Sequence, residues 1–291
     1  MFTRRDALAL SLAALVMPAK AEAQKIPVVA SFSIIGDFVR QVGGDRVSVT
    51  TIVGPDGDAH VYEPSPADGR RIAQARLIFV NGLGFEGWLD RLIKSAKSKG
   101  EVVTLGNGVA ARKDEEGQDP HAWQDVGNAK VYVEAIREAL TTADPEGAQT
   151  YKANADAYLA KLDALDAEIR QAIAAVPKER RRVVSTHDAF GYFAARYGVE
   201  FIAPQGVSTE AEVSARDVAR IIDAVRAHKV GAVFIENVAD PRLAKRIASE
   251  TGARMGGTLY SDALSDAKGD GATYIDMMRH NVKELAKTLA P

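Results

Sequence analysis

The stretch DPEGAQTYKANADAYLAKLDALDAEIRQAIAAVP, residues 144–177, lies near the middle of the chain and decides how the rest is organised. Asp144 followed by Pro145 is typical of a helix start, and Pro177 ends the helical pattern. Between them apolar side chains recur every three or four residues, at Tyr151, Ala155, Tyr158, Leu162, Leu165, Ile169 and Ile173. This spacing predicts one helix over 145–176, about 48 Å long at a rise of ~1.5 Å per residue.

Short β-branched runs alternate with amphipathic stretches on both sides of this helix. Before it stand IPVVASF (26–32), VSVTTIV (47–53), RLIFV (76–80) and EVVTL (101–105), and after it RVVST (182–186), EFIAP (200–204), GAVFIE (231–236) and ARMGGTL (253–259). Such alternation is typical of βα units around a parallel sheet. We therefore predict an α/β protein with two similar lobes and mostly parallel sheets.

The predicted boundaries are an N-terminal α/β lobe at 24–143, a long linking helix at 144–177 and a C-terminal α/β lobe at 178–291. A long packing helix inside one domain is the alternative interpretation. We expect a rigid helical connection to limit hinge closure, so that a ligand between the lobes would be trapped by small shifts of lobes and loops.

Charge and composition exclude several classes of protein. The 291 residues include 37 Lys+Arg against 39 Asp+Glu, a net charge of −2, which argues against a nucleic-acid partner because such proteins usually carry a basic stripe. The absence of cysteine excludes disulfides, thiolate metal sites and cysteine nucleophiles. Any metal ion must therefore be bound by imidazole or carboxylate groups.

Residues 1–23 are typical of an export signal. Arg4 and Arg5 precede an apolar run that is shorter than a membrane span, and Ala21-Glu22-Ala23 fits a signal-peptidase site. The arginine pair suits the twin-arginine route or an ordinary Sec signal. No lipid-acceptor cysteine follows, so we expect a product that is free in the periplasm or secreted.

Four loops that follow predicted strands each contain a strong metal donor. They are PDGDAHVYEPSP with His60, DPHAWQD with His121, THDAFGYF with His187 and LYSDALS with Asp262. Open α/β sheets bind ligands at the carboxyl ends of their strands, so a site using all four would lie in the cleft between the lobes. His228 and His280 fall on predicted helices and receive no role.

These phrases also resemble the zinc- and manganese-binding solute receptors of bacterial ABC importers, the cluster A-I receptors. The resemblance runs in order over the mature chain and includes NGLGFEGWLD (81–90), GVSTEAEVSARDVARIID (206–223), VFIENVADPRLAKRIASETGA (233–253) and TYIDMMRHNVKEL (273–285). It implies two α/β lobes joined by a long helix. It also implies a metal site made of His60, His121, His187 and Asp262.

The resemblance implies Zn²⁺ or Mn²⁺ as the transported ion. Three imidazoles and one carboxylate favour Zn²⁺, because Mn²⁺ prefers more oxygen ligands and its receptors typically have Glu at the position of His187. The segment ARKDEEGQDP (111–120) lacks the His-rich loop of many zinc receptors, which weakens this preference. Expected partners are the cognate membrane permease and a periplasmic metallochaperone, and the receptor is expected to be a monomer.

The competing classes are an exported metallo-hydrolase with Asp262 as its base, and an adhesive module with a structural metal. Four protein ligands leave no open position for catalysis, and no H-E-x-x-H, G-x-S-x-G or P-loop motif occurs, so we expect no enzyme. Four carboxylates are candidates to orient the histidines or, equally, to cap helices: Asp119, Asp188, Glu210 and Glu236. Trp123 and Phe190 are candidates to shield the site from water, but the preferred interpretation is that they are core aromatics.

Overall fold

The computed structural model describes residues 25–113, 117–228 and 230–290. The predicted export signal at 1–23 lies outside these residues. Among the described helices, none is both long enough and apolar enough to cross a membrane.

The N-terminal lobe contains a parallel four-stranded sheet in the order β2-β1-β3-β4. Strands β1, β2 and β3 are largely buried and rich in β-branched residues, as expected of a sheet covered by helices, whereas the edge strand β4 is more exposed. Along the chain its elements are β1 (Ile26–Phe32), α1 (Ser33–Gly43), β2 (Val47–Val53), α2 (Pro66–Gln74), β3 (Leu77–Val80), α3 (Leu89–Ser95), β4 (Glu101–Thr104) and α4 (Val126–Ala143).

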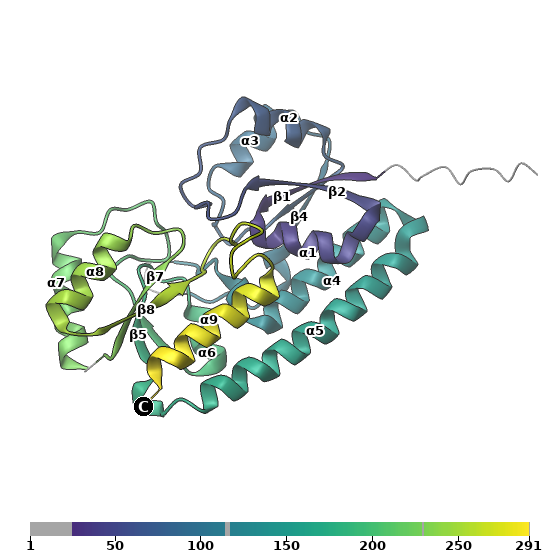
Figure 1. Cartoon of the computed structure of the whole chain (residues 1–291). Coiled ribbons are helices and arrows are strands. Elements are labelled where there is room, and N and C mark those ends of the chain that lie inside the picture. The colour runs from purple at the N-terminus through teal and green to yellow at the C-terminus, as the bar shows by residue number, and fades with distance from the viewer. Residues whose placement is uncertain (1–24, 114–116, 229, 291) are drawn as a thin grey trace, which may run out of the picture.

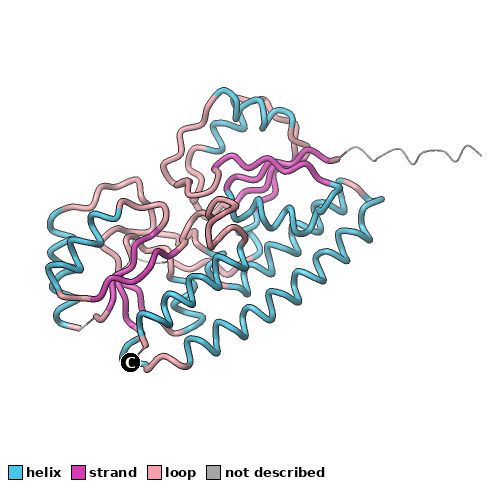
Figure 2. The backbone as a smooth tube through the Cα atoms, in the orientation of Figure 1, coloured by secondary structure: helices cyan, strands magenta, loops and turns pink. Residues whose placement is uncertain are grey.

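The C-terminal lobe repeats this topology with a second parallel sheet in the order β6-β5-β7-β8. Its elements are β5 (Arg182–Val184), α6 (Gly191–Tyr197), β6 (Glu200–Ile202), α7 (Ala215–Ala227), β7 (Ala232–Glu236), α8 (Pro241–Thr251), β8 (Arg254–Leu259) and α9 (Tyr274–Leu289). The two predicted α/β lobes are therefore present, and loops lie between their two sheets (Figure 2).

The long helix α5 (Ala148–Ala174) extends past both lobes and packs against α1, α4 and α9 (Figure 1). The seven apolar positions predicted from the sequence are its buried residues. The predicted start was wrong, because Pro145–Gly147 forms a separate 3₁₀ turn before the helix. The Asp144 side chain caps neither element and instead accepts hydrogen bonds from Arg46 Nε and Tyr151 Oη, each 2.7 Å long.

The hydrophobic core is continuous between the lobes. One buried cluster combines residues from both sheets with the inner faces of α4, α5 and α9, while a smaller cluster lies under α7 and α8. Helix α9 ties the lobes directly, since the backbone N–H of Tyr274 donates to Asp37 Oδ2 at 2.9 Å and its ring lies 4.7 Å from that of Phe38. Helix α9 and the shared core therefore join the two lobes.

Candidate metal centre

The four predicted ligands meet at the junction of the lobes. His60 lies in the loop after β2 and His121 in the segment between β4 and α4, whereas His187 follows β5 and Asp262 follows β8. All four side chains are buried, each at most 5 % exposed. One donor atom from each lies within 4.8 Å of the donors of the other three. Parallel strands place these loops at one edge of each sheet, and packing of the lobes brings the two edges together.

Three imidazole Nε2 atoms surround the carboxylate of Asp262. Its Oδ2 lies 3.2 Å from His187 Nε2 and 3.5 Å from His60 Nε2, and its Oδ1 lies 3.6 Å from His121 Nε2. The Nε2 atoms of His60 and His121 are 3.3 Å apart. Two histidine nitrogens at this distance, together with a carboxylate, form a donor set that suits a cation.

The carboxylate of Asp262 supports the same interpretation. Neither of its oxygens has a hydrogen-bond partner among the described residues, although the side chain is fully buried. An ionised carboxylate buried without donors is costly unless a cation balances its charge. The residues present therefore fit a divalent metal ion.

The charges of His187 and Asp262 couple metal binding to the release of a proton. Burial favours neutral His187, but the carboxylates of Glu236 and Asp262 prevail and raise its pKa well above the usual value. Burial also opposes ionisation of Asp262, yet the neighbouring His187 and His121 hold its pKa well below its usual value. Without metal, His187 is therefore a cation beside an anion, and a metal ion must displace its proton.

Two of the four candidate supporting carboxylates contact ligand histidines. Asp119 Oδ1 lies 2.9 Å from His121 Nδ1 and accepts the backbone N–H of the same residue at 3.0 Å. Glu236, the last residue of β7, places its Oε2 2.6 Å from His187 Nδ1. Contacts of this kind leave each Nε2 as the ligand atom.

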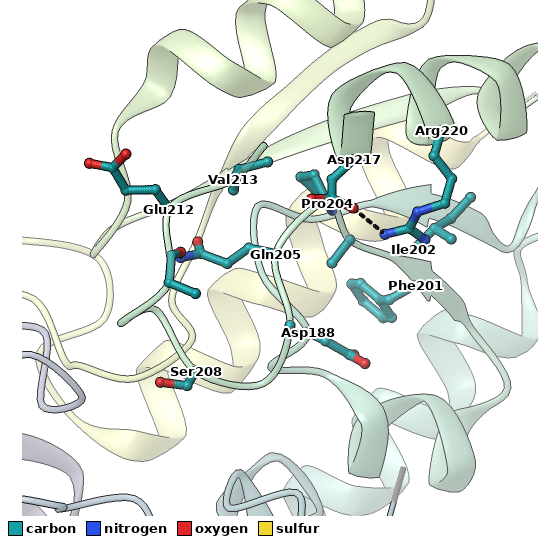
Figure 3. A pocket seen from close by; sticks show the side chains of 13 residues that line it. Asp188, Phe201, Ile202, Pro204, Gln205, Ser208, Glu212, Val213, Asp217 and Arg220 are labelled. Carbon is teal, nitrogen blue, oxygen red and sulfur yellow. Dashed lines mark hydrogen bonds and ion pairs between the residues drawn. The ribbon is translucent and has the colours of Figure 1, made fainter. Parts of the chain in front are cut away.

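The other two candidates lie elsewhere. Asp188 lines a cavity of about 510 Å³ beside α7 and β6, together with Gln205, Glu212 and Arg220 (Figure 3). Glu210 is exposed on the adjacent loop. Because this cavity is on the C-terminal lobe and contains none of the four ligands, it is distinct from the metal centre.

His60 is oriented by a contact that bridges the lobes. Its backbone N–H donates to Asp58 Oδ1 at 2.9 Å, while Asp58 Oδ2 accepts the hydroxyl of Thr209 from the C-terminal lobe at 2.7 Å. Nothing in the local sequence pattern marks Asp58 or Thr209, because their pairing depends on how the lobes face each other.

An aromatic wall borders the histidines, and sequence reasoning identified only part of it. Phe85 packs edge-on against His60 at 4.6 Å between ring centroids and lies 6.0 Å from His121. Trp123 lies 5.4 Å from the His121 ring and donates its indole N–H to the carbonyl of Ser261 at 2.9 Å. Phe85 was missed, although the motif NGLGFEGWLD that contains it was recognised. Phe190 stacks on Phe201 as a core aromatic, as expected.

Of the two remaining histidines, His280 lies on a helix, as predicted, whereas His228 is the residue just after one. His228 is exposed at the C-terminal end of α7. His280 lies in α9, with Nε2 2.9 Å from the carbonyl oxygen of Thr258. Neither belongs to the four-residue group found in the described part of the chain.

The chain is similar to known metal-binding proteins over nearly its whole length. The family model ZnuA, described as zinc-uptake complex component A, periplasmic, matches residues 28–288. The manganese-binding lipoprotein MntA of Halalkalibacterium halodurans is 37 % identical over 272 residues, which is 92 % of this chain and 90 % of that protein.

Two further relatives are similar to this chain over more than nine-tenths of its length. The metal ABC transporter substrate-binding lipoprotein SsaB of Streptococcus sanguinis is 30 % identical, over 94 % of this chain and 92 % of that protein. The solved structure of the periplasmic zinc-binding protein TroA from Treponema pallidum superposes with a TM-score of 0.88 at 32 % identity, covering 92 % of this chain and all of that one.

Proposed function

Because the chain belongs to the ZnuA family of periplasmic metal-binding receptors of ABC importers, which are not enzymes, we propose that its cargo is Zn²⁺, bound by His60, His121, His187 and Asp262. The observation that carries this proposal is the donor set, three imidazole nitrogens and one carboxylate, buried together where the lobes meet. Imidazole suits Zn²⁺, whereas Mn²⁺ favours carboxylate and water oxygens.

The spacing of the donors supports a small four-coordinate ion. At Zn–ligand distances of about 2.0–2.2 Å, neighbouring atoms of a tetrahedral shell lie about 3.3–3.6 Å apart. The contacts between His187, His60 and His121 and the Asp262 oxygens are 3.2 Å, 3.5 Å and 3.6 Å long. The four donor atoms lie within 4.8 Å of one another, so binding of one central ion would draw the more widely separated donors closer together.

In the proposed cycle the exported receptor takes up Zn²⁺ in the periplasm and delivers it to the membrane permease of an ABC importer. The ion is the cargo, so the protein's part is to bind and release it without chemistry. A periplasmic metallochaperone as a loading partner and a monomeric receptor belong to the same proposal, as does export by the signal at 1–23 through the twin-arginine or Sec route.

A manganese receptor is the second candidate, and the names of relatives favour it. Several are described as manganese-binding or manganese transporter proteins. Most sites with nitrogen and oxygen donors bind Zn²⁺ more tightly than Mn²⁺, so affinity in solution does not by itself identify the cargo. The deciding test must therefore include uptake by cells.

The experiment combines metal analysis with transport. Purified protein, stripped with chelator and reloaded from an equimolar Zn²⁺–Mn²⁺ mixture, should contain one Zn²⁺ per chain, and His187→Ala should retain less. His228→Ala is the matched control, because this exposed histidine lies outside the site. Cells lacking the receptor should lose high-affinity zinc uptake. Loss of manganese uptake with normal zinc uptake would make it a manganese receptor, and protein without bound metal would refute the site.

A further inference from the structure

Glu236 is a fully buried carboxylate whose two oxygens serve different donors. Its Oε1 accepts three hydrogen bonds from the turn that carries His187: from Thr186 N at 2.7 Å, from Thr186 Oγ1 at 2.5 Å and from His187 N at 2.9 Å. Its Oε2 faces the ring of His187, 2.6 Å from Nδ1. Neither Nδ1 nor Oε2 has any other hydrogen-bond partner among the described residues, so each depends on this contact.

We propose that Glu236 is a positioning residue for the metal site, which holds His187 in the one neutral tautomer that can bind the ion. A neutral imidazole carries its proton on one nitrogen only. With Oε2 as an acceptor beside Nδ1, the single proton of a neutral ring stays on Nδ1, and Nε2, 3.2 Å from Asp262 Oδ2, is left free to bind the ion. This inference rests on the proposed function, in which His187 is a ligand.

The division between the two oxygens makes the site sensitive to a Glu236→Gln substitution. The three donors of Thr186 and His187 require an oxygen, so the amide oxygen of the glutamine must take the place of Oε1. Its NH₂ group then faces Nδ1 and can only donate. Nδ1 becomes the acceptor and the proton moves to Nε2, which removes the lone pair that the metal ion needs.

Asp119 provides a matched control, because it supports His121 with one oxygen alone. Oδ1 serves both the Nδ1 and the backbone N–H of His121, whereas Oδ2 lies 3.6 Å from Arg112 Nε. In Asp119→Asn the amide oxygen can replace Oδ1 and keep both contacts, and the half-exposed Arg112 can turn away from the new NH₂. The tautomer of His121 is preserved and only a charge is lost.

The test compares Zn²⁺ affinities of the purified wild-type protein and the variants E236Q, D119N, H187A and E236Q/H187A by competition with a chelating dye. Removal of a supporting partner typically weakens metal binding by about 10–100-fold. We expect a loss of about 100-fold for E236Q and of about 10-fold or less for D119N. In the H187A background E236Q should cause no further loss, because its effect acts through His187. An effect on general folding would instead lower affinity equally in both backgrounds.

Several results would overturn the inference. An E236Q protein that binds Zn²⁺ as well as D119N does, or losses that add in the double variant, would show that Glu236 does not act through the His187 tautomer. Wild-type affinity in H187A would refute the ligand set itself, which separates failure of the proposed function from failure of this inference. If E236Q does not fold, E236D enters the same cycle. It keeps the charge but withdraws the carboxylate from Nδ1, so it should also weaken binding only when His187 is present.

Discussion

At the scale of single residues, the proposed metal site depends on a buried carboxylate that faces three imidazole nitrogens. Asp262 is fully buried, and its only charged or polar neighbours in the described contacts of the site are imidazole nitrogens of His60, His121 and His187. Binding of a divalent ion stabilises a buried carboxylate of this kind strongly, because the ion replaces the water that the carboxylate lost on burial. The residue is thus expected to be the strongest single determinant of affinity.

We predict that Asp262→Ala weakens Zn²⁺ binding by more than the ~10–100-fold cost of removing a supporting contact. The reason is that the substitution removes both a ligand and the negative charge that faces three histidines. Asp270→Ala is the matched control, because the Asp270 side chain is 82 % exposed. Isothermal titration with Zn²⁺ measures both, and equal affinities in the two variants would contradict the assignment.

Binding should also weaken as the pH falls. Despite burial, Glu236 and Asp262 raise the pKa of His187, so its proton is already bound in metal-free protein at neutral pH and must leave when Zn²⁺ enters. Affinity then falls by about tenfold per pH unit for each displaced proton. Calorimetry in buffers of different ionisation enthalpy counts these protons. An affinity at pH 5 equal to that at pH 7.5 would contradict a three-histidine site.

The raised pKa of His187 affects the stability of the metal-free protein in the opposite direction: low pH weakens metal binding but stabilises the metal-free fold. Because His187 gains its proton more readily in the folded than in the unfolded chain, its contribution to stability is complete below the unfolded pKa near ~6.5. This contribution is lost as the pH rises through the higher folded pKa. Metal-free protein is therefore favoured by the acidic conditions that release the ion.

At the scale of elements, α5 connects the lobes through a narrow apolar stripe. Every predicted inward position of the helix is buried, and the neighbouring positions are largely polar or exposed. Polar contacts add to this packing at the C-terminal end, where Asp166 accepts hydrogen bonds from Arg196 and Tyr197 of α6, each 2.8 Å long. The buried face of α5 thus packs against both lobes. This packing, rather than the intrinsic helix propensity of its residues, is what stabilises the helix.

Leu162→Ala should test this stripe. The side chain is fully buried, so the substitution should cost about 2–5 kcal/mol of unfolding free energy. Lys161→Ala, one residue away on the exposed face, should change stability by about 0.5 kcal/mol or less. Urea denaturation of metal-free protein measures both. Similar midpoints for the two variants would mean that α5 is not a structural spine.

At the scale of the whole molecule, we expect the fold not to depend on the ion. The continuous core joins both sheets with α4, α5 and α9, and contacts such as Tyr274 N to Asp37 Oδ2 hold the lobes together away from the metal centre. A receptor must survive release of its cargo, and this arrangement allows it. Loops at the junction, including the Asp58–Thr209 contact, are the parts expected to adjust.

We therefore predict that chelator leaves the protein folded and monomeric but less heat-stable. Far-ultraviolet circular dichroism should be unchanged, while the midpoint of thermal unfolding should rise on adding Zn²⁺. Binding to the folded state alone adds about 2.7 kcal/mol at a free concentration of 100 Kd. Unfolding on metal removal would instead indicate a structural metal, as in the adhesive-module interpretation.

The sequence by itself determined what depends on local periodicity and chemistry. Eight short β-branched runs correspond to eight strands in the described chain, and the seven-residue stripe of α5 was predicted in full, because burial of one face imposes a period that any window of sequence displays. The four donors were singled out for a related reason. Each follows a strand, and parallel strands bring their carboxyl ends to one edge. That they bind the metal stays a prediction.

The tertiary structure alone decided how residues distant in the chain meet. It selected Glu236 and Asp119, rather than Asp188 and Glu210, as partners of the histidines, and it brought Phe85 against His60. It also diverted Asp144 from its predicted cap, because the side chain accepts hydrogen bonds from Arg46 and Tyr151 instead. Such contacts depend on the packing of the lobes, which brings together side chains separated by dozens of residues and leaves no periodic trace in the sequence.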